Sequence, residues 1–423
     1  MDTVNGVRRL LLTLRRRAQS AVLRRLRRSR FFPRTIPDRR GEDLAMATAR
    51  FDATVMVYFP GALDTTYQIT PWLPTFEALH RVHRVVIVCQ DSRVAEQLGR
   101  GSSFPVVTIA RYGTLDGILS RSEVKLALYV SHLPRNFEAL RFGSLVHAYI
   151  GHGDSDKGVS ASNQLKAYDF VFAPGQAAVD RIERRLMRFD AAAHCRIVGQ
   201  PLTLSAPLPA EGEATGSGAV LYAPTWEGAQ PSVAYSSVLA QGERLVRGLI
   251  ADGRFPVLYR PHPLIGVTSP AYAVADRAIR EAIAAAGGPH RVISADDEAL
   301  ESTFARASAL ICDVSAVATA WLPSLKPIVV TASAGPGAVS ADSGMLSAVP
   351  RLPADEADRA ADLVAGEMRD EEGRGRRQQL VAYYLSPYWP DGLTDRFVAV
   401  CDEVIAERDV LRGRLVEQGA TGV

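Results

Sequence analysis

The sequence predicts an α/β protein with two similar domains, each a parallel β-sheet with crossover helices. The chain has 423 residues, which is enough for two ordinary α/β domains, and 47% of them are hydrophobic. Short apolar runs alternate with segments of helical spacing, the pattern of strands joined by crossover helices. The alternation stops over residues 203–218, which are rich in Pro, Gly, Ser and Ala, and then starts again.

Before this break, the chain contains the strands and helices expected of one parallel sheet. The predicted strands cover residues 54–59, 85–89, 106–109, 126–130, 145–150, 170–172 and 196–198, and helical spacing is found, for example, over 75–82 and 177–188. Because each strand is followed by a crossover segment, the strands should run parallel in a Rossmann-like layer sandwich.

After the break a second alternation predicts the other domain. Its expected strands cover residues 220–223, 256–259, 292–294, 309–312 and 328–331, with helices near 238–250, 272–285, 298–305 and 316–322. A long C-terminal helix should follow, from Leu393 to about Leu415. The predicted organisation is a basic segment (1–45), a first domain (46–205), a second domain (206–388) and a helical end (389–423). A ligand is expected in the cleft between the domains, at the carboxyl ends of strands.

The N-terminal segment carries the unusual charge of the chain. Residues 1–40 contain thirteen arginines and two aspartates, a net charge of +11, so the remainder of this +3 chain carries −8. Leucines interleaved with the arginines predict a basic amphipathic helix that ends near Pro33. We expect residues 1–30 to lie on an anionic membrane surface, with the leucines in the interface. A solvated charged segment, a helix docked on its own protein, and nucleic-acid binding are the alternatives.

Several classes of protein are disfavoured by what the sequence lacks. It contains no apolar run long enough to span a membrane and no apolar core of a signal peptide. The four cysteines are far apart, which suggests neither a disulfide framework nor a metal site and favours a reducing, cytoplasmic compartment. The glycine-rich, nucleophile-elbow and zinc motifs of dehydrogenases, P-loop enzymes, α/β-hydrolases and zinc enzymes are missing. We therefore expect no metal and no cofactor.

The first chemical motif is His152-Gly153-Asp154-Ser155-Asp156-Lys157-Gly158, directly after a predicted strand. Imidazole can take a proton from a hydroxyl near neutral pH, so His152 is our candidate general base. Asp154 is a candidate to orient it or to hold the acceptor, and Lys157 is a candidate to bind a phosphate. A polar turn whose histidine only bonds its neighbours is the alternative.

The second motif is Tyr259-Arg260-Pro261-His262-Pro263, again at the end of a strand. The prolines should fix the loop, while Arg260 and His262 are donors suited to diphosphate oxygens. A rigid loop with a surface histidine is the alternative. The remaining histidines, His80, His83, His132, His147, His194 and His290, lack such contexts, and we interpret them as structural.

The third motif follows the strand predicted at 309–312. Asp313 and Ser315 lead into a helix whose free N–H groups can hold a phosphate, although a helix cap is an equally good interpretation. Thr225 ends the first strand of the second domain and is a further candidate ligand.

In their order these motifs resemble the CDP-glycerol:poly(glycerophosphate) glycerophosphotransferase family of teichoic-acid polymerases and primases. The resemblance runs from about residue 146 to 397 and includes 221–225, 260–263, 313–315, 326–328 and the closing segment 391–397. The sequence departs from the family pattern at Asp154-Ser155, where a threonine-proline or related pair is usual, and at Ala316, where a second serine is usual.

The resemblance implies a GT-B fold, with two Rossmann-like domains facing a central cleft, and a CDP-alcohol donor held mainly by the second domain. It implies that His152 deprotonates the acceptor hydroxyl, that Arg260 and His262 bind the donor phosphates, and that Ser315 holds the diphosphate. Thr394 and Arg396 would assist from the C-terminal segment.

The expected reaction transfers a polyol phosphate, with glycerol phosphate favoured, to a lipid-linked polymer at the cytoplasmic face of the membrane, with no nucleic-acid partner. A GT-B glycosyltransferase with a nucleotide-sugar donor is the nearest alternative. A non-catalytic membrane scaffold is the alternative from another class.

Overall fold

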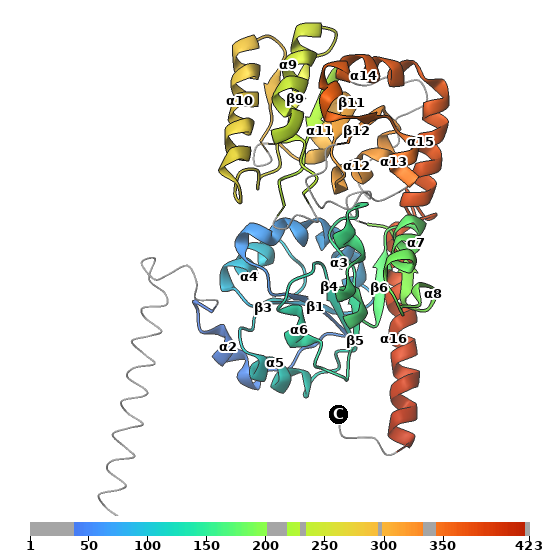
Figure 1. The fold of residues 1–423 in the computed structure, drawn as a ribbon. Helices are drawn as coiled ribbons and strands as arrows, with labels where there is room; N and C mark the ends of the chain where they lie inside the picture. The colour runs from blue at the N-terminus through green and yellow to red at the C-terminus, as the bar shows by residue number, and fades with distance from the viewer. Residues whose placement is uncertain (1–37, 201–217, 229–233, 295–297, 333–343, 419–423) are drawn as a thin grey trace, which may run out of the picture. The chain divides into compact units, whose positions relative to one another are not determined.

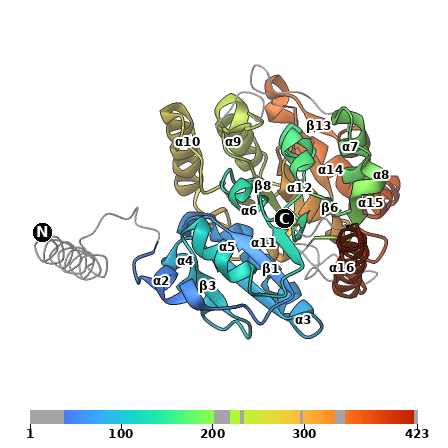
Figure 2. The ribbon, with the colours of Figure 1, turned by 90° about the horizontal axis from the view of Figure 1, so that it is seen from below.

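The computed structural model describes residues 38–200, 218–228, 234–294, 298–332 and 344–418. The predicted membrane-binding helix and the predicted linker at 203–218 lie almost entirely outside these residues. In the described parts of the chain the strands form two parallel sheets, labelled in Figure 1 and seen from below in Figure 2. All four cysteines are buried and unbridged. No described helix has the length and apolar character needed to cross a membrane.

The first sheet has the strand order β3-β2-β1-β4-β5-β6-β7. Its strands are β1 (Val55–Phe59), β2 (Val85–Cys89), β3 (Val106–Thr108), β4 (Leu126–Tyr129), β5 (Val146–Tyr149), β6 (Phe170–Ala173) and β7 (Cys195–Ile197). Helix α2 (Glu42–Ala45) precedes β1, and the helices between the strands are α3 (Leu73–His80), α4 (Ser92–Gly99), α5 (Tyr112–Leu119), α6 (Asn136–Ala139), α7 (Gln176–Arg185) and α8 (Ala191–His194). Alternate strand residues such as Met56 and Tyr58 pack against Leu115 and Ile118 of α5.

The second sheet repeats this topology with the order β10-β9-β8-β11-β12-β13. Its strands are β8 (Ala219–Ala223), β9 (Val257–Tyr259), β10 (Arg291–Val292), β11 (Ala307–Cys312), β12 (Ile328–Thr331) and β13 (Arg351–Leu352). Its helices are α9 (Glu243–Asp252), α10 (Pro270–Ala286), α11 (Leu300–Arg306), α12 (Ala316–Trp321), α13 (Gly344–Ala348), α14 (Ala360–Arg369) and α15 (Glu371–Tyr384). A π-helical turn, Val238–Gly242, precedes α9.

Side-chain alternation on β8 divides the core of the second sheet into two layers. Val220 and Tyr222 face α9, α10 and α14, and helices α9 and α10 lie side by side (Figures 1 and 2). Leu221 and Ala223 face the opposite layer, which contains Trp321 of α12 and Tyr384 of α15. Both faces of the sheet are therefore covered, which explains why its strands are almost uniformly apolar.

The contacts divide the chain into two compact units that do not follow the predicted boundary at residue 205. The first unit contains residues up to His152, Ala167–Val171 and Phe397 onward, and the second contains Gly153–Lys166 and Phe172–Arg396. The motif that begins at His152 is therefore split, because its segment after the histidine packs with residues of the second sheet. The last helix, α16 (Leu393–Glu417), begins in the second unit and continues in the first.

All the predicted strands are present, and so are the helices expected at 75–82, 177–188, 238–250, 272–285, 298–305 and 316–322 and at the C-terminus, with shifts of a few residues at their ends. Strand β13 was not predicted, because its two residues carry almost no periodic signal. Helices α14 and α15 were not predicted either, because their many charged residues obscure the apolar face that packs on the sheet.

Candidate functional site

Except for Thr394 and Arg396, which lie on α16 (Leu393–Glu417), the predicted site residues follow the carboxyl ends of strands, where open α/β sheets bind ligands. Each sheet has a switch point, between β1 and β4 in the first and between β8 and β11 in the second. Thr225 follows β8, and Asp313 and Ser315 follow β11, so these three residues flank the second switch point. His262 follows β9 and His152 follows β5, each one strand away from its switch point.

His152 belongs to the first unit and has the proton arrangement of a base. Its Nδ1 lies 3.2 Å from the carbonyl oxygen of Val130, which can only accept a hydrogen bond. Nδ1 therefore carries the hydrogen, and in the neutral ring Nε2 has a lone pair. Burial lowers the pKa of His152, although the Val130 bond favours the charged ring. The imidazole is thus a neutral proton acceptor at pH 7, beside the exposed ring of Tyr67.

The rest of this motif is held in the second unit by Arg181 of α7, a residue that the sequence motifs did not single out. Its guanidinium forms buried ion pairs with Asp154 at 2.5 Å and with Asp156 at 2.9 Å. Burial opposes the charge of Arg181, but the two carboxylates outweigh it and raise the pKa of the guanidinium. Tyr384 of α15 donates a hydrogen bond to Asp156.

These contacts change the interpretation of Asp154, which we expected to orient His152 or to hold the acceptor. Its carboxylate is buried against Arg181, and its own N–H donates to Gln200. Oδ1 of this carboxylate therefore anchors the loop to α7, while Oδ2 is buried without a hydrogen-bond partner among the described residues. The sequence could not reveal this role because Arg181 is one of several arginines on a helix 27 residues away.

This loop positions Lys157 next to the residues that follow β8. Its Nζ donates a hydrogen bond of 3.0 Å to Oγ1 of Thr225 and lies 5.8 Å from the centre of the Tyr235 ring. Burial lowers the pKa of Lys157 to about 8, while Asp313 favours the charged form. Lys157 remains mostly protonated at pH 7, as a phosphate-binding cation requires. The structure thus brings together Lys157 and Thr225, two of the predicted ligands.

His262 lies in the same cluster, but with the opposite proton arrangement to His152. The N–H of Leu264 donates to its Nδ1 at 3.1 Å, so Nδ1 bears the lone pair and Nε2 bears the hydrogen of the neutral ring. Burial lowers the pKa of His262 to about 4, and the charge of Lys157 adds to the effect. The ring also stacks against Trp226, with 6.2 Å between the ring centres. His262 is therefore suited to donate a hydrogen bond.

Asp313 joins the loops around the second switch point. Its Oδ2 accepts from the backbone N–H groups of Thr225 and Ser237, and its Oδ1 accepts from Thr331. The side chain is completely buried, which raises its pKa. Both oxygens are thus occupied by protein donors. Asp313 therefore positions Thr225 through the backbone N–H of that residue.

Ser315 remains a candidate ligand. It occupies the N-cap position of α12, is 7% exposed, and its Oγ has no hydrogen-bond partner in the described part of the chain. Its hydroxyl does not cap the helix, so the interpretation as a helix cap is wrong. A buried hydroxyl without a partner is costly, and a phosphate oxygen would satisfy it. Since α12 has only six residues, its dipole adds little to this site.

Three further candidates have contacts that do not decide their role. Arg260 donates from Nη1 to Oγ1 of Thr303 at 2.8 Å, and burial lowers the pKa of its guanidinium. Thr394 lies in the first turn of α16, and Arg396 contacts the carbonyl of Ile197 and the ring of Tyr388. The binding of donor phosphates by these three residues stays a prediction.

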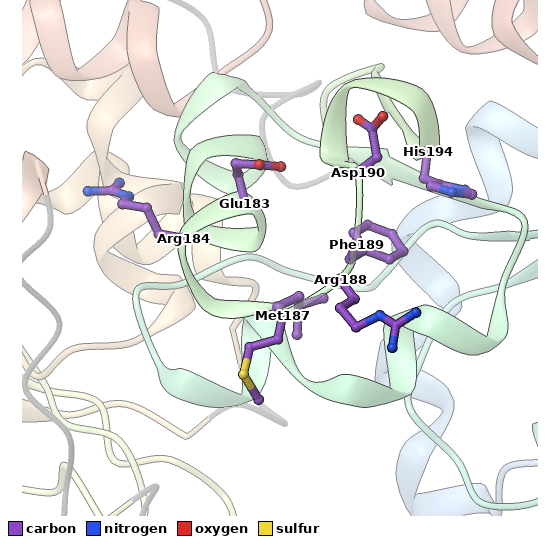
Figure 3. Close-up of a pocket in the computed structure, with 8 residues that line it drawn as sticks. Glu183, Arg184, Met187, Arg188, Phe189, Asp190 and His194 are labelled. Atoms are coloured by element: carbon purple, nitrogen blue, oxygen red, sulfur yellow. The ribbon is translucent and has the colours of Figure 1, made fainter.

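A surface cavity of about 930 Å³ lies in the second unit, where α7 ends and α8 begins. Figure 3 shows its lining side chains, from Glu183 of α7 to His194 of α8. Two of its carboxylates stabilise the local structure, since Glu183 accepts a hydrogen bond from the N–H of Ala191 and Asp190 caps α8. Its lining includes no predicted site residue, and we do not assign the chemistry to it.

Much of the second sheet falls within a segment that matches a known protein family. Residues 208–334 match the model of the CDP-glycerol:poly(glycerophosphate) glycerophosphotransferase family. The predicted resemblance is confirmed. This segment contains Thr225, Arg260, His262, Asp313 and Ser315. No curated protein sequence matches the chain significantly.

Solved structures confirm the GT-B fold. The wall teichoic acid polymerase TagF is 14% identical, with 96% of this chain and 99% of that chain covered and a TM-score of 0.51. A glycosyltransferase from Rickettsia africae ESF-5 is 11% identical, with 85% and 99% covered and a TM-score of 0.52. MnaA from S. aureus, in a co-structure with UDP, is 12% identical, with 81% and 94% covered and a TM-score of 0.51. The family match indicates a transferase, and the solved structures show its fold.

Proposed function

We propose that this protein transfers a polyol phosphate, most simply glycerol phosphate, from a CDP-activated donor to a hydroxyl of a teichoic-acid-like or capsular polymer, and releases CMP. The observation that carries the proposal is the contrast between two neutral histidines. His152 offers a lone pair at Nε2, as a base needs, whereas His262 offers an N–H, as a diphosphate needs, and lies near enough to Lys157 for that charge to lower its pKa. The family match over residues 208–334 supports the choice of a CDP-alcohol donor.

In the proposed reaction the acceptor hydroxyl gives its proton to Nε2 of His152 while its oxygen forms a bond to the β-phosphorus of the donor. The bond from that phosphorus to the bridging oxygen breaks, and its electron pair leaves with CMP. Negative charge on the leaving phosphate increases during this step, so Lys157, the N–H of His262 and the hydroxyl of Ser315 would stabilise it. The protein itself forms no covalent intermediate.

We further propose that the protein works at the inner surface of the membrane, where a lipid-linked polymer acceptor would be located. The support is the charge of +11 over residues 1–40, interleaved with leucines, which suits a helix lying on anionic lipid.

A donor screen tests the proposal directly. Purified protein is incubated with CDP-glycerol, CDP-ribitol, UDP-glucose and UDP-N-acetylglucosamine, each with a polyol-phosphate acceptor, and released nucleotide is measured. We expect CMP from a CDP-alcohol, loss of at least a hundredfold in kcat for His152→Ala, and little change for His194→Ala, a histidine on α8. Full turnover by a folded His152→Ala protein would remove the base that we assign.

A nucleotide-sugar glycosyltransferase is the second candidate, because the Rickettsia africae glycosyltransferase has the same fold. Consumption of a UDP-sugar, with no CMP released from either CDP-alcohol, would favour it.

A further inference from the structure

A second histidine of the first unit, His132, follows the strand next to the one that precedes His152. Strands β4 and β5 are parallel neighbours, and Tyr129 is paired with Tyr149. His132 follows Tyr129 by three residues, just as His152 follows Tyr149 by three. Each histidine therefore follows the last paired tyrosine of its strand by three residues, and His132 follows β4, the strand at the switch point. The repeated Tyr-x-x-His spacing is visible in the sequence and could have singled out His132.

His132 is fixed by ring stacking, and one of its ring nitrogens makes no hydrogen bond to the described residues. Its ring stacks on Tyr149, with 4.2 Å between ring centres and 11° between planes. Its Nδ1 is buried and has no hydrogen-bond partner among the described residues. Burial, helped by the proximity of His152, lowers the pKa of His132 to about 4, so the ring is neutral. A buried nitrogen left unpaired is costly, and a bound hydroxyl would satisfy it.

We propose that Nδ1 of His132 binds the acceptor hydroxyl adjacent to the one that His152 deprotonates, so that the protein selects acceptors ending in a vicinal diol. This inference rests on the proposed function. Two neutral imidazoles that follow adjacent strands match two neighbouring hydroxyls, since each ring can either donate or accept a hydrogen bond. His132 is thus assigned to acceptor selection instead of the purely structural role expected from the sequence.

Two acceptors that differ by one hydroxyl test this proposal with the full-length protein and CDP-glycerol. The first is the dodecyl phosphate ester of glycerol, which ends in a 1,2-diol, and the second is the dodecyl phosphate ester of 1,3-propanediol, which ends in one hydroxyl. We expect the wild-type protein to favour the diol at least tenfold in kcat/KM for the acceptor. His132→Leu should remove this preference mainly by raising KM for the diol. His83→Leu, which removes a histidine paired with Asp402 in the same unit, should retain it.

Two further variants keep the test decisive if His132→Leu folds poorly. His132→Asn keeps a polar atom near the position of Nδ1, whereas His132→Gln places its amide nearer that of Nε2. We expect His132→Asn to retain most of the diol preference and His132→Gln to lose it. Equal selectivity in wild type, His132→Asn and His132→Gln would overturn the inference.

Failure of the inference and failure of the proposed function give different results. If no CDP-alcohol releases CMP with either acceptor, the proposed function is wrong. If CMP is released equally well with the diol and the single hydroxyl, the transferase stands and the role of His132 is wrong. Protection against thermal unfolding by CDP serves as a control, because it reports the donor site and should be unchanged by His132→Leu.

Discussion

At the scale of single residues, burial determines which candidate side chains carry charge. Burial lowers the pKa of His152 and His262, so both rings are neutral and differ only in which nitrogen holds the hydrogen. Burial also lowers the pKa of Lys157 to about 8, which is only about one unit above neutral pH. Donor binding and catalysis should therefore depend on pH in different ranges.

The lowered pKa of Lys157 predicts that donor binding weakens as pH rises through 8, because the ammonium loses its proton. Between pH 7 and pH 9 we expect the affinity for CDP, measured by calorimetry, to fall by up to about tenfold. Lys157→Arg should bind CDP with little dependence on pH over this range, since guanidinium stays charged. Lys166→Arg, on an exposed lysine that donates to the carbonyl of Met187, should behave like wild type. An unchanged affinity at pH 9 in the wild type would contradict this role for Lys157.

The lowered pKa of His152 predicts where activity is lost in acid. A base works only when deprotonated, so kcat should remain high as pH falls to about 6.5 and should decline only below that value. The measurement is the pH profile of kcat with saturating CDP-glycerol, in buffers that keep the protein folded. An acidic limb centred above pH 7 would show that another group limits the reaction.

At the scale of elements, α7 holds the loop that follows His152. Arg181 of this helix forms an ion pair with each of Asp154 and Asp156, and Tyr384 of α15 donates a hydrogen bond to Asp156. The approach between loop and helices is close, since a Cβ atom on Gly153 would lie 3.3 Å from that of Ala316. Lys157 reaches Thr225 because this network fixes the loop in the second unit.

Removal of Arg181 should therefore destabilise the protein and weaken donor binding together. Arg181→Met leaves two buried carboxylates without their cation, and we expect the free energy of unfolding in urea to fall by about 3–5 kcal/mol. Arg184→Met, on an exposed arginine of the same helix, should change it by less than about 0.5 kcal/mol. Combining Arg181→Met with Asp154→Asn and Asp156→Asn should restore part of the loss, because the uncompensated charges are gone. A loss no larger than that of Arg184→Met would refute the buried network.

At the scale of the whole molecule, charge is concentrated at one end of the chain. Residues 1–40 carry +11 and the remaining residues carry −8, so the acidic remainder would be repelled by an anionic surface. Attraction to anionic lipid must then come from the N-terminal segment, and it should weaken with salt.

Deletion of residues 1–37 tests whether the N-terminal segment alone binds the membrane. We expect the full chain to co-sediment with vesicles containing about 30% phosphatidylglycerol, to be released by about 0.5 M salt, and to bind purely zwitterionic vesicles weakly. The shortened protein should lose vesicle binding and keep turnover of a soluble acceptor within about twofold, since the deletion touches no proposed site residue. Vesicle binding that survives the deletion would show that another part of the protein contacts the membrane. Tight binding of duplex DNA by the full chain would instead favour the nucleic-acid alternative.

The order of residues along the chain was enough to predict the α/β class, the strands, and the position of the motif loops after those strands. Runs such as 85–89 and 309–312 are apolar because they are buried on both faces of a parallel sheet, and this is a local signal. The motif residues at 152, 262 and 315 stand at strand ends, which chain order alone reveals. The confirmed family resemblance also depended only on the spacing of these motifs.

Only the folded structure shows which residues distant in sequence are in contact. Arg181 pairs with carboxylates 25 and 27 residues away, and Asp313 accepts hydrogen bonds from three separate segments. His132 and His152 follow two strands that are parallel neighbours in the sheet. Burial and the hydrogen on each imidazole likewise depend on backbone groups such as the carbonyl of Val130. No local propensity encodes these contacts, because their free energy arises only when the chain has folded.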